Sequence, residues 1–137
     1  MKRLVLLLLV GATACASPLT SSRLQPSFAE AFTGLYVQQQ QLLGRTVVGV
    51  DLNVLASCRR TGKDVDGPGE DWVCAVQLSD SGTSVAQAFE VQMKPDGCWK
   101  ATGAPAVQPT DVVDPVTRAT ARNPLAEFDG CFDTSWR

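Results

Sequence analysis

Residues 44–58, GRTVVGVDLNVLASC, contain the change of hydrophobic pattern that decides the fold. Upstream of Gly44 the apolar residues recur every three or four positions, as on one face of a helix. Downstream, apolar residues alternate with polar ones as far as Cys58, which is typical of a strand with one buried face. That face would carry Val48, Val50, Leu52, Val54, Ala56 and Cys58. The sequence therefore predicts a helix that ends at Gly44 and a sheet that begins directly after it.

A capping box, Ser27-Phe28-Ala29-Glu30, predicts that the helix begins at Phe28. Residues 38–41 would cross its polar side, and Gly44 supplies the left-handed residue that ends it. We expect the aromatic face to pack against a sheet rather than to bind a ligand. This face consists of Phe28, Phe32, Leu35, Tyr36, Leu42 and Leu43.

Alternating apolar residues predict three further strands, at residues 72–78, 89–93 and 99–101. Turn-forming sequences separate them: a wide loop over 61–71, a polar turn over 79–82 and Lys94-Pro95-Asp96-Gly97. Neighbouring strands joined in this way form an antiparallel meander with one apolar face. The predicted fold is therefore α+β, with one N-terminal amphipathic helix packed on a four-stranded antiparallel meander and two disulfides.

The N-terminus predicts export. Residues 1–14 combine a positive start, an apolar run too short to span a bilayer, and small residues, as in a signal peptide. Ala12-Thr13-Ala14-Cys15 resembles the lipobox of bacterial lipoproteins and predicts lipidation of Cys15. Ordinary signal peptidase could instead cut after Ala14 or Ala16, which would give a secreted protein.

The remaining chain divides into a tether and one domain. Residues 15–26 are rich in Ser, Thr and Pro and predict a lipid-anchored flexible tether. Its residues 16–26 would reach about 35 Å at ~3.3 Å per residue, enough to hold a domain clear of a membrane. We expect residues 27–137 to form a single α+β domain with a proline-rich C-terminal excursion.

The chain has five cysteines, and lipidation or removal of Cys15 leaves an even four for an oxidising compartment. In the first predicted hairpin, Cys58 and Cys74 lie symmetrically about Asp66 and so face each other within disulfide reach. A Cys58–Cys74 bridge leaves Cys98–Cys131, while the two other connectivities remain open. We expect both bridges to be structural.

The composition limits the available chemistry. There is no histidine, so His-based catalytic triads and His-ligated zinc sites are excluded. The net charge of −2 without a basic cluster indicates no nucleic-acid partner. Four carboxylates crowd the first hairpin loop and could bind calcium weakly, although a solvated acidic turn is favoured: Asp64, Asp66, Glu70 and Asp71. We expect no enzyme activity, no cofactor and no metal; a carboxylate pair for glycoside hydrolysis is the catalytic alternative.

The predicted function is a non-catalytic binding or assembly module of the cell envelope. Its expected partners are the membrane, through lipidated Cys15, and an unknown envelope protein or extracellular ligand. Candidate contact residues are Trp72 and Trp99, with Trp136, where the hairpin turns meet the proline-rich excursion. For Trp72 a core position is favoured, because it shares the strand face of Cys74. The alternative is a secreted protease inhibitor of cystatin-like architecture, because residues 45–49 partly resemble the Gln-x-Val-x-Gly loop of cystatins.

Two patches of sequence, residues 96–101 (DGCWKA) and 123–132 (NPLAEFDGCF), resemble small uncharacterised lipoproteins from actinobacteria-type genomes. The similarity extends over residues 55–134. The resemblance implies an envelope location and supports the Cys98–Cys131 pairing. It implies no activity and no site residues.

Overall fold

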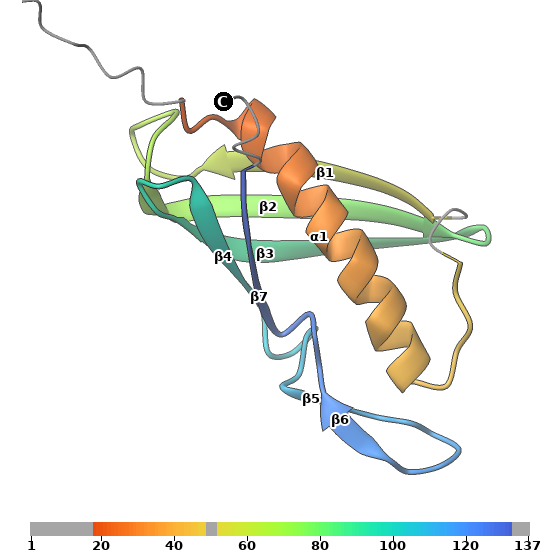
Figure 1. The fold of residues 1–137 in the computed structure, drawn as a ribbon. Coiled ribbons are helices and arrows are strands. Elements are labelled where there is room, and N and C mark those ends of the chain that lie inside the picture. Colours follow the sequence, from red (N-terminus) through yellow and green to blue (C-terminus); the bar gives the residue numbers. More distant parts are fainter. Residues whose placement is uncertain (1–17, 49–51, 133–137) are drawn as a thin grey trace, which may run out of the picture.

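The structure is a computed structural model that describes residues 18–48 and 52–132. One helix crosses a five-stranded antiparallel sheet of order β1-β2-β3-β4-β7, and a small hairpin, β5-β6, projects from one end of the domain (Figure 1). The predicted α+β class is confirmed, but the meander has a fifth strand. The helix is α1 (Ser21–Leu42), and the strands are β1 (Leu52–Arg60), β2 (Gly69–Asp80), β3 (Thr83–Met93), β4 (Cys98–Gly103), β5 (Asp111–Val113), β6 (Thr120–Arg122) and β7 (Glu127–Cys131).

The start of α1 differs from the prediction. The helix begins at Ser21, with Thr20 as N-cap and no side-chain cap hydrogen bond, so the predicted start at Phe28 is wrong. Residues 21–26 of the predicted tether are helical, with Pro26 inside the helix. Leu24 is fully buried and extends the apolar face by one turn, and this burial offsets the backbone hydrogen bond that proline removes.

The end of α1 combines a confirmed prediction with a wrong one. Gly44 has a φ of 77° just beyond the helix, as expected of a left-handed stop. However, Gln39 and Gln40 are buried, whereas Leu42 is exposed, so the predicted polar side is wrong here. Gln39 bonds to amide side chains of distant segments, which the helical pattern could not show, and Gln40 bonds to Gln39 and Arg45.

The first strand also begins later than predicted. β1 starts at Leu52, and Val48 lies in the exposed connection from the helix. Val50 lies outside the described residues. The turns around residues 79–82 and 94–97 are confirmed: Gly82 and Gly97 have φ angles of 84° and 85° at the ends of β2-β3 and β3-β4.

The core lies between α1 and the sheet and confirms the expected packing of the aromatic helix face. The ring of Phe28 is 5.4 Å from those of Trp99 and Phe128 and 5.6 Å from that of Phe89, measured between ring centroids. These side chains come from α1, β3, β4 and β7. The unpredicted strand β7 therefore contributes to the centre of the core through Phe128.

Both predicted disulfides are present, between Cys58 and Cys74 and between Cys98 and Cys131. Each joins residues directly opposite each other on paired strands, with Cα atoms 4.1 Å and 3.9 Å apart. The first bridge is buried under α1, whereas the second lies on the other face of the sheet, where Cys131 is exposed. Two such bridges are typical of an oxidising, extracytoplasmic compartment.

The predicted signal peptide and the lipidation site Cys15 lie outside the described residues. Within the described ranges, no helix combines the length and apolar character needed to cross a bilayer.

Candidate contact surface

The tryptophans predicted as contact residues are core residues. Trp72 is 0% exposed and Trp99 is 1% exposed. Trp72 Nε1 donates to the carbonyl of Gly67 (3.0 Å), and Trp99 Nε1 donates to Ser27 Oγ (2.9 Å). The core position favoured for Trp72 is therefore confirmed, whereas Trp99 is enclosed within the domain and not available as a contact residue. Trp136 lies outside the described residues.

The acidic loop between β1 and β2 is organised around Arg60. Arg60 Nη2 lies 2.6 Å from Asp71 Oδ1, and Nη1 lies 3.9 Å from Asp64 Oδ2. The hydrogen bond from Arg60 lowers the pKa of Asp71, assisted by the backbone N–H of Gly62. Two of the four candidate calcium ligands thus face a guanidinium. In the described part of the chain, no group of three or more Asp, Glu, Cys or His side chains is placed to hold a metal ion.

A buried cluster of three amides lies near the end of α1. Gln39 Nε2 donates to Gln108 Oε1 and to Asn123 Oδ1, both at 2.9 Å. Asn123 Nδ2 donates to Gln108 Oε1 (3.1 Å) and to the Pro109 carbonyl (2.8 Å), while its Oδ1 accepts from the N–H of Leu125 (3.0 Å). Gln108 Nε2 continues the cluster to Gln87 of β3 (2.6 Å). The amide cluster therefore fixes both ends of the proline-rich excursion to the helix and the sheet.

The excursion contains the hairpin β5-β6, residues 111–122, which we call the arm. Within it Val112 is buried, but Val113 is exposed and Val116 at the tip is 87% exposed. Asp114 Oδ1 accepts from the N–H groups of Val116 (2.8 Å) and Thr117 (3.1 Å), and these bonds lower the pKa of Asp114. The tip is thus an ordered turn that presents an apolar side chain to solvent.

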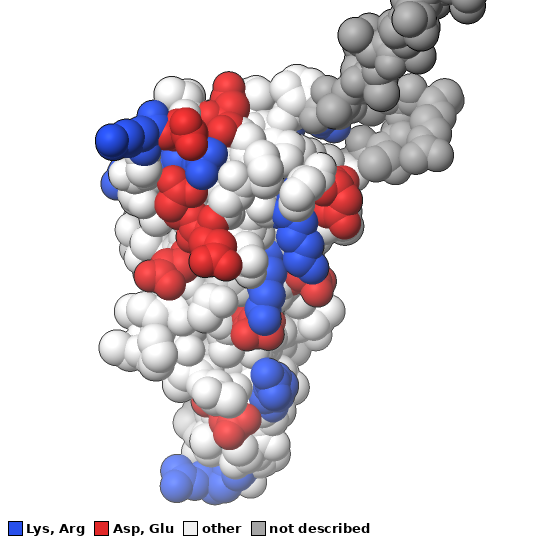
Figure 2. All heavy atoms as spheres, turned by 90° about the vertical axis from the view of Figure 1, so that its left-hand side faces the viewer, with Lys and Arg blue, Asp and Glu red and all other residues white. Residues whose placement is uncertain are grey.

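A cleft of about 490 Å³ lies at the base of the arm. Lys100 and Glu127 form an ion pair in this cleft, with 3.0 Å between Nζ and Oε1, and neither side chain is buried. Charges of both signs are also found elsewhere: on the face shown in Figure 2, basic and acidic side chains are interspersed from one end of the domain to the other. The cleft lining comprises Leu35, Lys100, Arg122, Asn123, Pro124, Glu127, Phe128 and Asp129.

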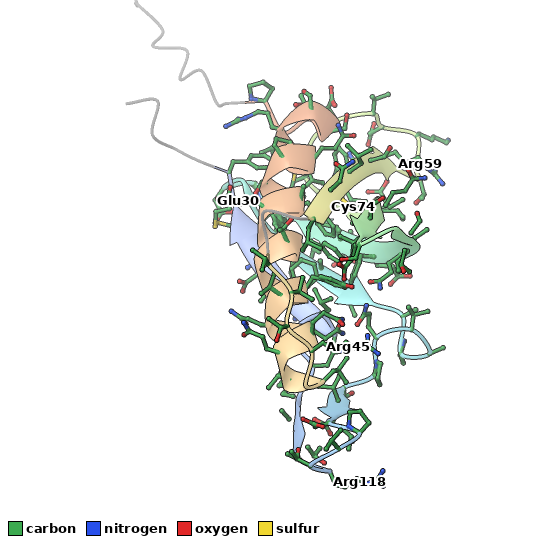
Figure 3. All side chains as sticks on the ribbon, turned by 90° about the vertical axis from the view of Figure 1, so that its right-hand side faces the viewer. Glu30, Arg45, Arg59, Cys74 and Arg118 are labelled. Carbon is green, nitrogen blue, oxygen red and sulfur yellow. A yellow bond between two sulfur atoms is a disulfide. The ribbon has the colours of Figure 1, made fainter. Side chains whose placement is uncertain are left out.

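The arm lies at the opposite end of the domain from the β1-β2 loop and the β3-β4 turn (Figure 1). Figure 3 shows the same separation, with Arg59 near the start of α1 and Arg118 at the other end. The expected meeting of these turns with the proline-rich excursion therefore does not occur. Val112-Val113 followed by Asp114-Pro115 is the sequence signal for the arm, since an apolar pair before Asp-Pro is typical of a strand entering a turn.

The sequence predicts that the cystatin-like segment, residues 45–49, enters the first strand directly after the helix. This prediction is wrong for its described residues, 45–48. Residues 45–48 form part of the connection between α1 and β1, where Arg45 Nη1 donates to Gln40 Oε1 (3.0 Å) and Val48 is 52% exposed. Gly49 lies outside the described residues.

Comparison with protein-family models, curated proteins and solved structures finds no match for this chain.

Proposed function

We propose that this chain is a lipid-anchored module of the cell envelope that binds a protein partner through the arm and the cleft at its base. The observation that carries the proposal is the exposure of Val116 on a hairpin whose base is fixed by the buried amide cluster. An ordered apolar side chain loses little conformational freedom on binding, so more of the contact energy is available for affinity. Exposed apolar groups beside charged ones are also typical of protein contacts.

The location in the envelope has separate support. The two disulfides favour an oxidising compartment, and the N-terminal sequence has the pattern of a lipoprotein signal with Cys15 as the modified residue. The resemblance of residues 96–101 and 123–132 to small lipoproteins supports the same location.

The test is photo-crosslinking of the full chain in intact cells. A photo-reactive residue is placed at Val116, and a control residue at Leu55, which is also apolar and 61% exposed but lies on the sheet. We expect one reproducible protein adduct from position 116, identified by mass spectrometry, and at least about tenfold less from position 55. Equal adducts at the two positions, or none at position 116, would contradict the proposal.

A protease inhibitor is the second candidate, favoured by the helix laid across an antiparallel sheet and by the exposure of Val48 after that helix. This function requires that the chain inhibit a papain-type protease stoichiometrically and that Val48→Asp abolish the inhibition. A protease that keeps full activity at a molar excess of this chain excludes that candidate.

A further inference from the structure

We propose that the end of the domain opposite the arm lies directly against the membrane, with the β1-β2 loop and the β3-β4 turn at the lipid headgroups. The inference rests on the proposed lipidation of Cys15 and adds an orientation to it. Three features of the described residues lead to it: where the chain joins the domain, how few residues precede that point, and which side chains surround it.

The chain is fixed to the domain from Pro18 onward. The N–H of Gly67 in the β1-β2 loop donates to the carbonyl of Leu19 (2.8 Å), and the Leu19 side chain packs against the core. Arg23 Nη1 donates to the carbonyl of Pro18 (3.2 Å). A Cβ added at Gly97 in the β3-β4 turn would lie 3.8 Å from Leu19 Cδ2. The chain therefore enters the fold between this loop and this turn.

Little chain remains between that point and the proposed anchor. Only Ala16 and Ser17 separate Cys15 from Pro18, so the span is at most about 11 Å at ~3.6 Å per residue. The headgroup layer of one leaflet is itself about 5–7 Å thick. The tether is thus far shorter than the 15–26 segment suggests, because α1 begins at Ser21. A domain held this closely cannot stand clear of the bilayer.

The side chains at this end suit a contact with headgroups. Val65, at the tip of the β1-β2 loop, is 79% exposed and lies beside exposed Lys63. Arg60 pairs with Asp71 and so offsets the charge of that carboxylate. Asp64 lies 3.9 Å from Arg60 but its side chain is 80% exposed, and Asp96 keeps its charge although its Oδ1 accepts from the N–H of Cys98 (2.9 Å). The exposed cations at this end are Arg59, Lys63 and Lys94.

The mixed charges at this end allow contact with the membrane only while the lipid anchor holds the domain there. Acidic residues remain beside the cations, so electrostatic attraction alone is weak and the anchor must supply the proximity. The unlipidated domain is therefore expected to show no binding to vesicles. Because the arm lies at the other end, it would be presented away from the membrane, toward partners in the envelope space (Figures 1 and 3).

The experiment uses the full lipidated chain in vesicles of phosphatidylcholine and phosphatidylglycerol. A photo-reactive residue at Val65 is compared with one at Val116, since both side chains are apolar and exposed. We expect lipid adducts at position 65 to exceed those at position 116 at least about tenfold. A matched chain carries about twenty Gly/Ser residues between Ser17 and Pro18, with an r.m.s. reach of about 25 Å, and should lose most of this excess.

The outcomes separate this inference from the proposed function. Equal lipid adducts at the two positions, or an excess that survives the insertion, would overturn the membrane-facing orientation alone. A mass spectrum of the chain from cells that shows no lipid on Cys15 would overturn the anchor and the orientation together. The protein adduct at position 116 in cells tests the arm independently of both.

Discussion

Ser27 accepts a hydrogen bond from the buried indole of Trp99, with 2.9 Å between Nε1 and Oγ, and donates to the carbonyl of Cys131 at 3.3 Å. One hydroxyl in the interior of α1 thus connects the helix to both β4 and β7. The sequence assigns the same serine to a helix cap. Its role is instead to satisfy a polar group that packing of Trp99 removes from water.

Ser27→Ala should lower the free energy of unfolding by about 1–3 kcal/mol, because the indole N–H of Trp99 loses its acceptor in a buried setting. Urea denaturation followed by circular dichroism measures the change. The control is Glu30→Ala, since Glu30 is exposed and its side chain would cap the helix together with Ser27 if the predicted box existed. We expect the control to stay within about 0.5 kcal/mol of the parent. Similar losses in the two variants would support the capping box instead.

Gly130→Ala should be destabilising because the edge of the Trp99 ring occupies the space for a side chain. A Cβ at position 130 would lie 2.5 Å from Trp99 Cζ2 and 2.9 Å from Cε2. Trp99 is buried and cannot move aside freely, so we expect a loss of about 1–3 kcal/mol in urea denaturation.

Gly34→Ala is the matched control for this substitution. Gly34 lies within α1, and a Cβ there meets nothing within 4 Å, so alanine should stabilise the protein by up to about 1 kcal/mol. Equal effects of the two substitutions would contradict the close packing of Trp99 on Gly130.

The helix and the first hairpin could be predicted because their patterns are local. Cys58 and Cys74 follow from symmetry about a turn, and Phe28 and Phe32 from helical spacing. The start of α1 could not be predicted in this way: Pro26 indicates a break, and only the burial of Leu24 against the sheet shows otherwise.

The missed parts of the fold depend on contacts between distant segments. β7 has five residues, too few for clear alternation, and its pairing with β4 brings Gly130 beneath Trp99. Gln39 carries no apolar signal, and its burial depends on Gln108 and Asn123, which lie 69 and 84 residues away. The wrong choice of Trp99 as a contact residue has the same origin, because residue type alone does not distinguish a buried indole from an exposed anchor.

Asn123→Ala should loosen the arm as well as the domain. The substitution leaves the N–H of Leu125, the carbonyl of Pro109 and one donor of Gln39 without their buried partner, and we expect a loss of about 2–3 kcal/mol. Hydrogen exchange should rise first in residues 104–126. Thr110→Ala is the control, since Thr110 is exposed on the same segment. Exchange that rises uniformly over the domain would contradict a local role of the amide cluster.

The two disulfides should differ in their access to reductant. Cys58 and Cys74 are 4% and 0% exposed, whereas Cys131 is exposed on the other face of the sheet. A mild thiol reductant should therefore open Cys98–Cys131 first, because the attacking thiolate must reach a sulfur atom. Alkylation at successive times and peptide mass spectrometry measure the order. Simultaneous reduction of both bridges would mean that the domain opens globally before either is attacked.

Asp71→Asn should change how stability depends on pH. The hydrogen bond from Arg60 lowers the pKa of Asp71 in the folded state, so its contribution is present above the unfolded pKa of about 3.9 and is lost as pH falls through the lower folded value. The variant should therefore have a lower Tm than the parent at neutral pH, with the difference shrinking below about pH 4. Asp129→Asn, on the exposed face of β7, removes a carboxylate of equal charge as the control. A Tm difference that stays constant down to acid pH would show that the bond to Arg60 does not depend on the charge of Asp71.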